Sequence, residues 1–166
     1  AFGVPFAFIF LIGYMSLTGK ALPDSSTPFL IWMVVAALSQ IFAQALLVHM
    51  FSFRNFAVGT AYSRTEPAQA ALFALLFLGE TIRLAAVVAI LIAVAGVMLI
   101  SVARTPFSMR SLLTSTFSRS SMIGLTSGAL FGVAAVGYRS ASLALVPGLP
   151  EPDFILQAGF TLACAI

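Results

Sequence analysis

Long apolar runs separated by short polar segments dominate the pattern of this sequence. Residues 2–18, 29–53 and 84–103 carry no formal charge, and residues 57–79 and 120–146 are apolar apart from isolated charges. A helix that crosses the hydrocarbon core of a membrane needs about 20 apolar residues. The pattern therefore predicts five membrane-spanning helices over these five ranges.

The segments between the runs have the composition of loops. Residues 23–28 form a polar turn rich in proline and serine, and residues 104–119 are rich in serine and threonine and carry three arginines. Residues 147–152 are proline-rich and precede a sixth apolar run, residues 154–166, which is shorter than a full span. Because the sequence also opens on alanine, we expect a fragment of a larger protein, with its sixth span truncated.

Composition supports a membrane rather than water as the main solvent. The chain of 166 residues is 61% hydrophobic and 8% charged, with a mean hydropathy of +1.10, whereas a soluble domain is about 25% charged. The buried helices of a soluble core can also be apolar on every side, but successive runs of this length favour the bilayer. The predicted fold class is all-α: a polytopic transmembrane helix bundle with five full spans and one truncated span.

Charge and side-chain chemistry exclude several functions. The net charge of +3 is distributed over loops and forms no dense basic groove, so we expect no nucleic-acid partner. One cysteine, Cys164, and one histidine provide no metal-ligand spacing. The sequence has no nucleophile elbow and no phosphate-binding loop. We therefore predict no metal, no cofactor and no enzymatic activity.

The third run, residues 57–79, contains the best candidate site because Arg64, Glu66 and Pro67 interrupt it. A charge inside a membrane costs at least about 2.5 kcal/mol, so it normally faces a cavity or a partner. Pro67 breaks the helix by removing a backbone hydrogen bond. One interpretation is a broken helix at a water-filled substrate cavity. The alternative is a helix that starts late, with Thr65 as N-cap and Pro67 in its first turn, although the remainder would span only about 20 Å.

Neighbouring polar residues extend this hypothetical cavity. Tyr62, Glu66 and Gln69 share a helical face by their spacing, and Gln40 and Gln44 share one face of the second run. These glutamines either bind substrate or join helices to one another by hydrogen bonds. A fixed arginine in a cavity of low dielectric favours a carboxylate or phosphate. We expect an anionic or zwitterionic substrate, in a cavity lined by Arg64, Glu66, Tyr62, Gln69, Gln40 and Gln44.

Several glycines and one acidic residue are predicted to be structural. Gly124, Gly128 and Gly132 form one stripe of the fifth run, where a second backbone can approach closely. Gly79 stands where the third run needs a helix C-cap. Glu80 lies on the N-terminal side of the next helix, where the helix dipole favours a carboxylate.

One stretch resembles a known family. Pro67-Ala-Gln-Ala-Ala-Leu-Phe-Ala-Leu-Leu-Phe-Leu-Gly79-Glu80, followed by a helix with Ala95-Gly96-Val97, is similar to the end of an EamA-type repeat of the drug/metabolite transporter superfamily. In that family the fourth helix has a central proline and ends in Leu-Gly-Glu. The segment that begins at Ser121-Met-Ile-Gly124 resembles the first helix of a second repeat. Ala89 departs from the pattern, since the family often has a glycine there.

The resemblance implies ten helices in two inverted five-helix repeats around a central substrate cavity. Residues 1–103 would form most of the first repeat, residues 104–119 a linker, and residues 120–166 the start of the second. The implied function is a secondary transporter, an exporter or permease, that moves a small polar or amphipathic metabolite by alternating access across a bacterial inner membrane. Its partners would be the lipid bilayer and a small-molecule substrate, and a homodimer is left open. The alternative is a non-transporting scaffold or accessory subunit.

Overall fold

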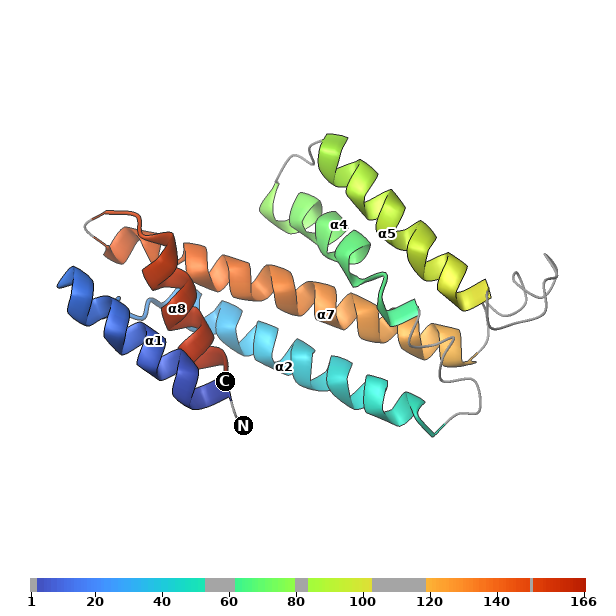
Figure 1. Ribbon diagram of the computed structural model, residues 1–166, viewed down its shortest axis with the longest axis horizontal. Coiled ribbons are helices and arrows are strands. Elements are labelled where there is room, and N and C mark those ends of the chain that lie inside the picture. Colours follow the sequence, from blue (N-terminus) through green and yellow to red (C-terminus); the bar gives the residue numbers. More distant parts are fainter. Residues whose placement is uncertain (1–2, 53–61, 80–83, 103–118, 150) are drawn as a thin grey trace. The chain divides into compact units, whose positions relative to one another are not determined.

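The computed structural model describes residues 3–52, 62–79, 84–102, 119–149 and 151–166. Over these ranges the chain is helical, without strands, as the sequence predicts. Figure 1 shows the elements, which are α1 (Gly3–Thr18), α2 (Thr27–Met50), α4 (Glu66–Leu78), α5 (Leu84–Val102), α7 (Arg119–Leu143), the 3-10 turn η1 (Val146–Gly148) and α8 (Phe154–Ala165).

Local sequence explains several helix ends. Gly19 follows α1 and Gly79 follows α4 with positive φ angles of 67° and 63°, a conformation that glycine adopts without steric cost. The Gly79 N–H donates to the carbonyl of Ala74 and so closes the C-terminal turn of α4. At the start of α2, the Ser26 hydroxyl accepts a hydrogen bond from the backbone N–H of Phe29 at 3.3 Å.

Two helical segments of the described chain are long and apolar enough to cross a membrane. They are Thr27–Met50 and Arg119–Gly148, and only 17% and 39% of their apolar windows are buried within the protein. Gly3–Thr18, Glu66–Phe77 and Phe154–Ala165 are shorter apolar helices. Most apolar side chains of α2 therefore point outward, where lipid would solvate them. The number of spans and the two-repeat arrangement stay predictions.

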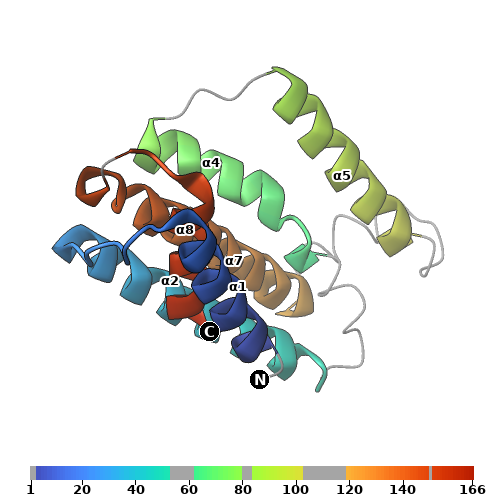
Figure 2. The ribbon, with the colours of Figure 1, turned by 60° about the vertical axis from the view of Figure 1, so that its left-hand side comes forward.

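The first of two compact units comprises Ala1–Ala37 and Gly137–Ile166. Its core contains Phe29, Met33, Ala141 and Leu145, against which Trp32, Tyr138 and Phe160 pack. In the same unit α1 lies along α8, as Figures 1 and 2 both show. Gly159 lies at this contact, where a Cβ would be 3.5 Å from Phe10 and 3.6 Å from Leu11, which is ordinary van der Waals distance.

The second unit comprises Leu38–Val136. In it α4 packs on α7 at two glycines, since a Cβ on Gly128 would lie 2.9 Å from the carbonyl oxygen of Ser63, and one on Gly132 would lie 3.0 Å from the nitrogen of Ala70. The buried hydroxyl of Ser127 donates to the carbonyl of Ala43 at 2.9 Å and joins α7 to α2. The unit boundary divides both α2 and α7, so each unit contains a part of these two helices.

Candidate functional site

The interruption predicted in the third run lies at Arg64 and Thr65. Tyr62 and Ser63 are helical, Arg64 and Thr65 form a turn, and α4 begins at Glu66. Thr65 is the N-cap residue of α4, but its hydroxyl does not cap the helix. It donates instead to the carbonyl of Tyr62 at 2.7 Å, and the backbone N–H of Thr65 donates to the same oxygen at 3.1 Å.

This geometry combines features of both interpretations of the third run. Pro67 lies in the first turn of α4, where a missing N–H leaves no acceptor unpaired. The carbonyl of Thr65 accepts from the N–H groups of Ala68 and Gln69 at 3.0 and 3.2 Å. The helix therefore starts at Glu66, as in the alternative, yet a helical segment also precedes the turn. Tyr62 precedes this turn, whereas Glu66 and Gln69 follow it, so a face shared by the three residues stays a prediction.

Gln69 joins the interruption to α7. Its amide nitrogen Nε2 donates to the Thr65 hydroxyl at 2.8 Å and to the carbonyl of Leu125 at 3.4 Å. The lack of a side chain at Gly128 makes this approach possible, because a Cβ there would lie 3.0 Å from Nε2. The turn is thus stabilised by neutral hydrogen bonds and by one glycine of the predicted stripe.

The two charged residues of the predicted site have different environments. Arg64 is exposed and Glu66 is half-buried. Among the described residues no ion pair joins them, so each can interact separately with water or with a bound molecule. The guanidinium group is the stronger candidate for an anion because it remains charged and presents several N–H donors.

The other predicted residues lie apart from these contacts. Gln40 and Gln44 are exposed on α2, and within the described residues no hydrogen bond joins them to Arg64 or Glu66. Gly124 is buried on α7. Glu80 lies outside the described residues. The cavity itself therefore stays a prediction.

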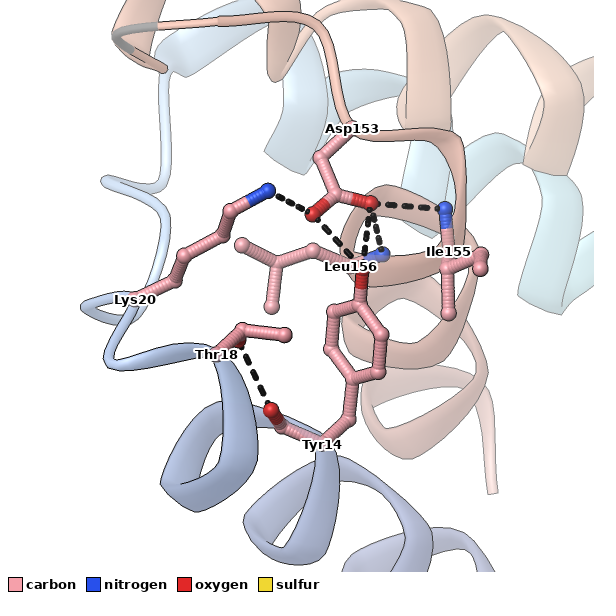
Figure 3. Close-up of polar contacts among 6 residues, drawn as sticks. All are labelled: Tyr14, Thr18, Lys20, Asp153, Ile155 and Leu156. Carbon is pink, nitrogen blue, oxygen red and sulfur yellow. Dashed lines mark hydrogen bonds and ion pairs between the residues drawn. The ribbon is translucent and has the colours of Figure 1, made fainter.

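A second polar group lies in the first unit, and the sequence did not predict it. Figure 3 shows Tyr14, Lys20 and two backbone N–H groups converging on Asp153. The Tyr14 hydroxyl donates to Oδ1 at 3.1 Å and to Oδ2 at 2.9 Å, and the Lys20 ammonium forms an ion pair with Oδ2. The N–H groups of Ile155 and Leu156 each donate to Oδ1 at 3.1 Å, so Asp153 is also the N-cap of α8.

This environment stabilises the charged forms of both partners. The hydrogen bond from Lys20, followed by that from the Leu156 N–H, lowers the pKa of Asp153 from 3.8 to about 2. The hydrogen bond to Asp153 raises the pKa of Lys20 above 10.5. The Asp153 side chain is 6% exposed, whereas that of Lys20 is 42% exposed. The aspartate before an apolar run does indicate an N-cap, but no local signal identifies partners 133 and 139 residues away.

A hollow of about 480 Å³ adjoins the ion pair in the same unit. Its walls come from the loop after α1 and from the segment that leads into α8. They are formed by Gly19, Lys20, Ala21, Leu22, Asp24, Gly148, Leu149, Glu151, Asp153 and Leu156. In neither unit do the described residues contain a group of three or more histidine, cysteine, aspartate or glutamate side chains that could bind a metal ion.

Long apolar helices with outward-facing side chains are typical of an integral membrane protein of the helical class. Residues 1–102 match the model of the EamA-like transporter family. Because this match covers more than half of the 166 residues, the chain belongs to that family. No curated protein and no solved structure matches it. The resemblance noted in the sequence is confirmed, and the family gives the protein a membrane-transport type of function that is generally not enzymatic.

Proposed function

We propose that the protein is a secondary transporter that exports or imports a small polar or amphipathic metabolite by alternating access, in a bacterial inner membrane. The interrupted helix before α4 is the observation that carries this proposal. It places an exposed arginine and a half-buried glutamate beside Pro67, within a run of otherwise apolar residues.

Three features of the interruption support a transport site. The backbone groups of the turn are hydrogen-bonded within the protein, so a stable break in the helix is possible at membrane depth. Discontinuous helices are a common site of substrate binding in secondary transporters. In the part of the chain that the structure describes, no ion pair joins Arg64 to Glu66, so the two charges do not neutralise one another.

The first experiment measures whether position 64 faces water. Arg64→Cys is made on a Cys164→Ala background in the full protein, which is then treated with a membrane-impermeant thiol reagent. We expect labelling, because a water-filled cavity at this position admits the reagent. The probes for the transport measurements on the native protein are succinate, leucine and choline, which are anionic, zwitterionic and cationic.

A matched control lies on the same helix. Leu76 is 66% exposed on α4, and in a membrane this apolar position faces lipid rather than water. Leu76→Cys should therefore stay unlabelled, since the thiolate that reacts forms only where water reaches the sulfur. If Arg64→Cys is labelled from neither side of the membrane, the residue is buried among helices and the scaffold function replaces the transporter.

The charge of the substrate is tested separately by competition. We expect succinate or leucine to be carried in preference to choline, because the Arg64 guanidinium attracts a carboxylate. A protein that carries choline alone would contradict this assignment while leaving transport itself intact.

A further inference from the structure

The contacts between α1 and α8 are polar at one end of the helix pair and apolar further along it. At one level Tyr14 contacts Asp153, and further along Phe10 and Leu11 approach Gly159. As the residue number falls along α1 it rises along α8, so the helices run antiparallel. The charged contacts lie where α1 ends and α8 begins, and the contacts at Gly159 are apolar.

Asp153 makes two separable sets of contacts at this end. The N–H groups of Ile155 and Leu156 belong to its own helix and persist wherever α8 moves. Lys20 and Tyr14 belong to the other segment, 133 and 139 residues away in the chain. Loss of the second set would release the end of α1 from the start of α8 and leave the cap of α8 intact.

The second set can be released because water reaches it. Lys20 lies on the loop after α1 with 42% of its side chain exposed, and the hollow of about 480 Å³ lies beside it. Water can solvate an ammonium at such a position when the pair separates, so an exposed ion pair holds two segments only weakly. The neighbouring carboxylates of Asp24 and Glu151 also line the hollow and would attract a released Lys20.

We propose that Lys20, Tyr14 and Asp153 form a latch, which closes one end of the α1–α8 pair and opens during each transport cycle. The opening motion is a separation of the two helix ends, with the apolar contacts at Gly159 as the part that stays packed. This inference rests on the proposed transport function, because alternating access requires helix ends to separate on one side of the membrane.

The latch is tested first by a distance measurement that needs no substrate. Nitroxide labels are attached to cysteines at Thr18 and Phe154 on a Cys164→Ala background; Thr18 is exposed and Phe154 is 73% exposed. We expect mainly one short distance by electron paramagnetic resonance in the otherwise native protein. Lys20→Met should enlarge a longer-distance population at least threefold, and Lys20→Arg should restore the native distribution.

A second variant covers the case in which Lys20→Met fails to fold. Tyr14→Phe removes one donor to Asp153 and retains the ring that stacks near Phe10. It should enlarge the longer-distance population less than Lys20→Met does. If both variants show the native distribution, the latch does not exist.

The matched control is a label pair towards the other ends of the same helices. Phe6 and Leu162 are 72% and 51% exposed, and labels there should show less than half the distance change seen at the latch. An equal or larger change would mean that Lys20→Met loosens the whole helix pair, and would overturn the latch.

A transport experiment then tests whether the latch must open. The cysteines at Thr18 and Phe154 are joined by a short reversible bifunctional thiol reagent, and uptake of succinate and leucine is measured. We expect at least a tenfold loss that a reductant reverses, with no loss after the monofunctional reagent. Undiminished uptake in the cross-linked protein overturns the proposal. If the unmodified protein carries none of the probes, the transport function fails, whereas the label distances still decide whether the helix ends are latched.

Discussion

The two units stabilise polar groups among apolar helices in different ways. In the first unit Asp153 receives two backbone N–H bonds, a tyrosine hydroxyl and an ammonium, all at the ends of α1 and α8. In the second unit an interruption within a helix is stabilised by neutral groups of Tyr62, Thr65 and Gln69, with Gly128 providing space.

This difference follows from the cost of charge in a medium of low dielectric. Two full charges can pair at a small cost in desolvation free energy where water still reaches one partner, as it does at the exposed Lys20. Within an apolar run, hydroxyl, amide and carbonyl groups satisfy a broken backbone without adding a charge. Arg64 and Glu66 break this rule in the second unit, which is why they are the residues to which we assign substrate contact.

The largest loss of stability is expected from filling the glycine contact of the second unit. A Cβ on Gly128 would lie 2.9 Å from the carbonyl oxygen of Ser63, a backbone atom that cannot move alone. Gly128→Ala should therefore cost about 1–3 kcal/mol, the usual range for overpacking, and lower the thermal unfolding temperature in detergent. Gly96→Ala is the control, because a Cβ there meets nothing within 4 Å. Equal unfolding temperatures for the two variants would show that α4 and α7 are not closely packed.

A large effect on transport, without one on folding, is expected at Arg64. Arg64→Gln should reduce uptake of an anionic probe at least tenfold, which corresponds to about 1.4 kcal/mol of lost binding or transition-state stabilisation. The control is Arg119→Gln, at an exposed arginine where α7 begins. Equal uptake by both variants would remove Arg64 from the substrate site and leave the second unit with a structural break only.

A smaller effect on stability, one that depends on pH, is expected in the first unit and not in the second. Because the pKa of Asp153 is lowered from 3.8 to about 2, the folded state binds fewer protons there than the unfolded state. Its contribution to stability is present above pH 3.8 and declines as the pH falls towards about 2. The raised pKa of Lys20 adds a contribution that is lost only above pH 10.5. We therefore expect the contribution of Asp153 and Lys20 to the free energy of unfolding to stay constant between pH 3.8 and pH 10.5.

The fluorescence of Trp32, which packs on the core of this unit, can report the unfolding. Asp153→Asn should flatten the acid limb of the stability curve, since asparagine still caps a helix but carries no charge. Lys20→Met should shift that limb to higher pH, because the ammonium makes the largest contribution to the lowered pKa. An acid limb that is identical in all three proteins would contradict the ion pair.

The smallest effect is expected at Ser127. Its buried hydroxyl donates to the carbonyl of Ala43 at 2.9 Å and joins α7 to α2 in the second unit. Hydrogen bonds between membrane helices contribute about 0.6 kcal/mol on average, so Ser127→Ala should lower stability by about that amount. A loss above about 2 kcal/mol in denaturant unfolding would mean that this hydrogen bond stabilises the unit far more than the average one between membrane helices.

The sequence determined the helical class and the membrane environment of this protein. The uncharged runs became helices close to their predicted bounds, because apolar length and the positions of glycine and proline are local properties. The segment from Pro67 to Glu80 and the helix with Ala95-Gly96-Val97 indicated the family, which the match over residues 1–102 then confirmed. The cavity residues, the two repeats and the substrate stay predictions.

Only the tertiary structure decided which distant residues meet. The Asp153 cap was visible as a pattern, but Tyr14 and Lys20 became its partners through the antiparallel packing of α1 and α8. The spacing of Gly128 and Gly132 indicated a close approach without indicating that Ser63, Gln69 and Ala70 would fill the space. Helix formation depends on neighbours within a few residues, whereas these contacts depend on which helices pack together, and that choice is made by the whole chain in its membrane.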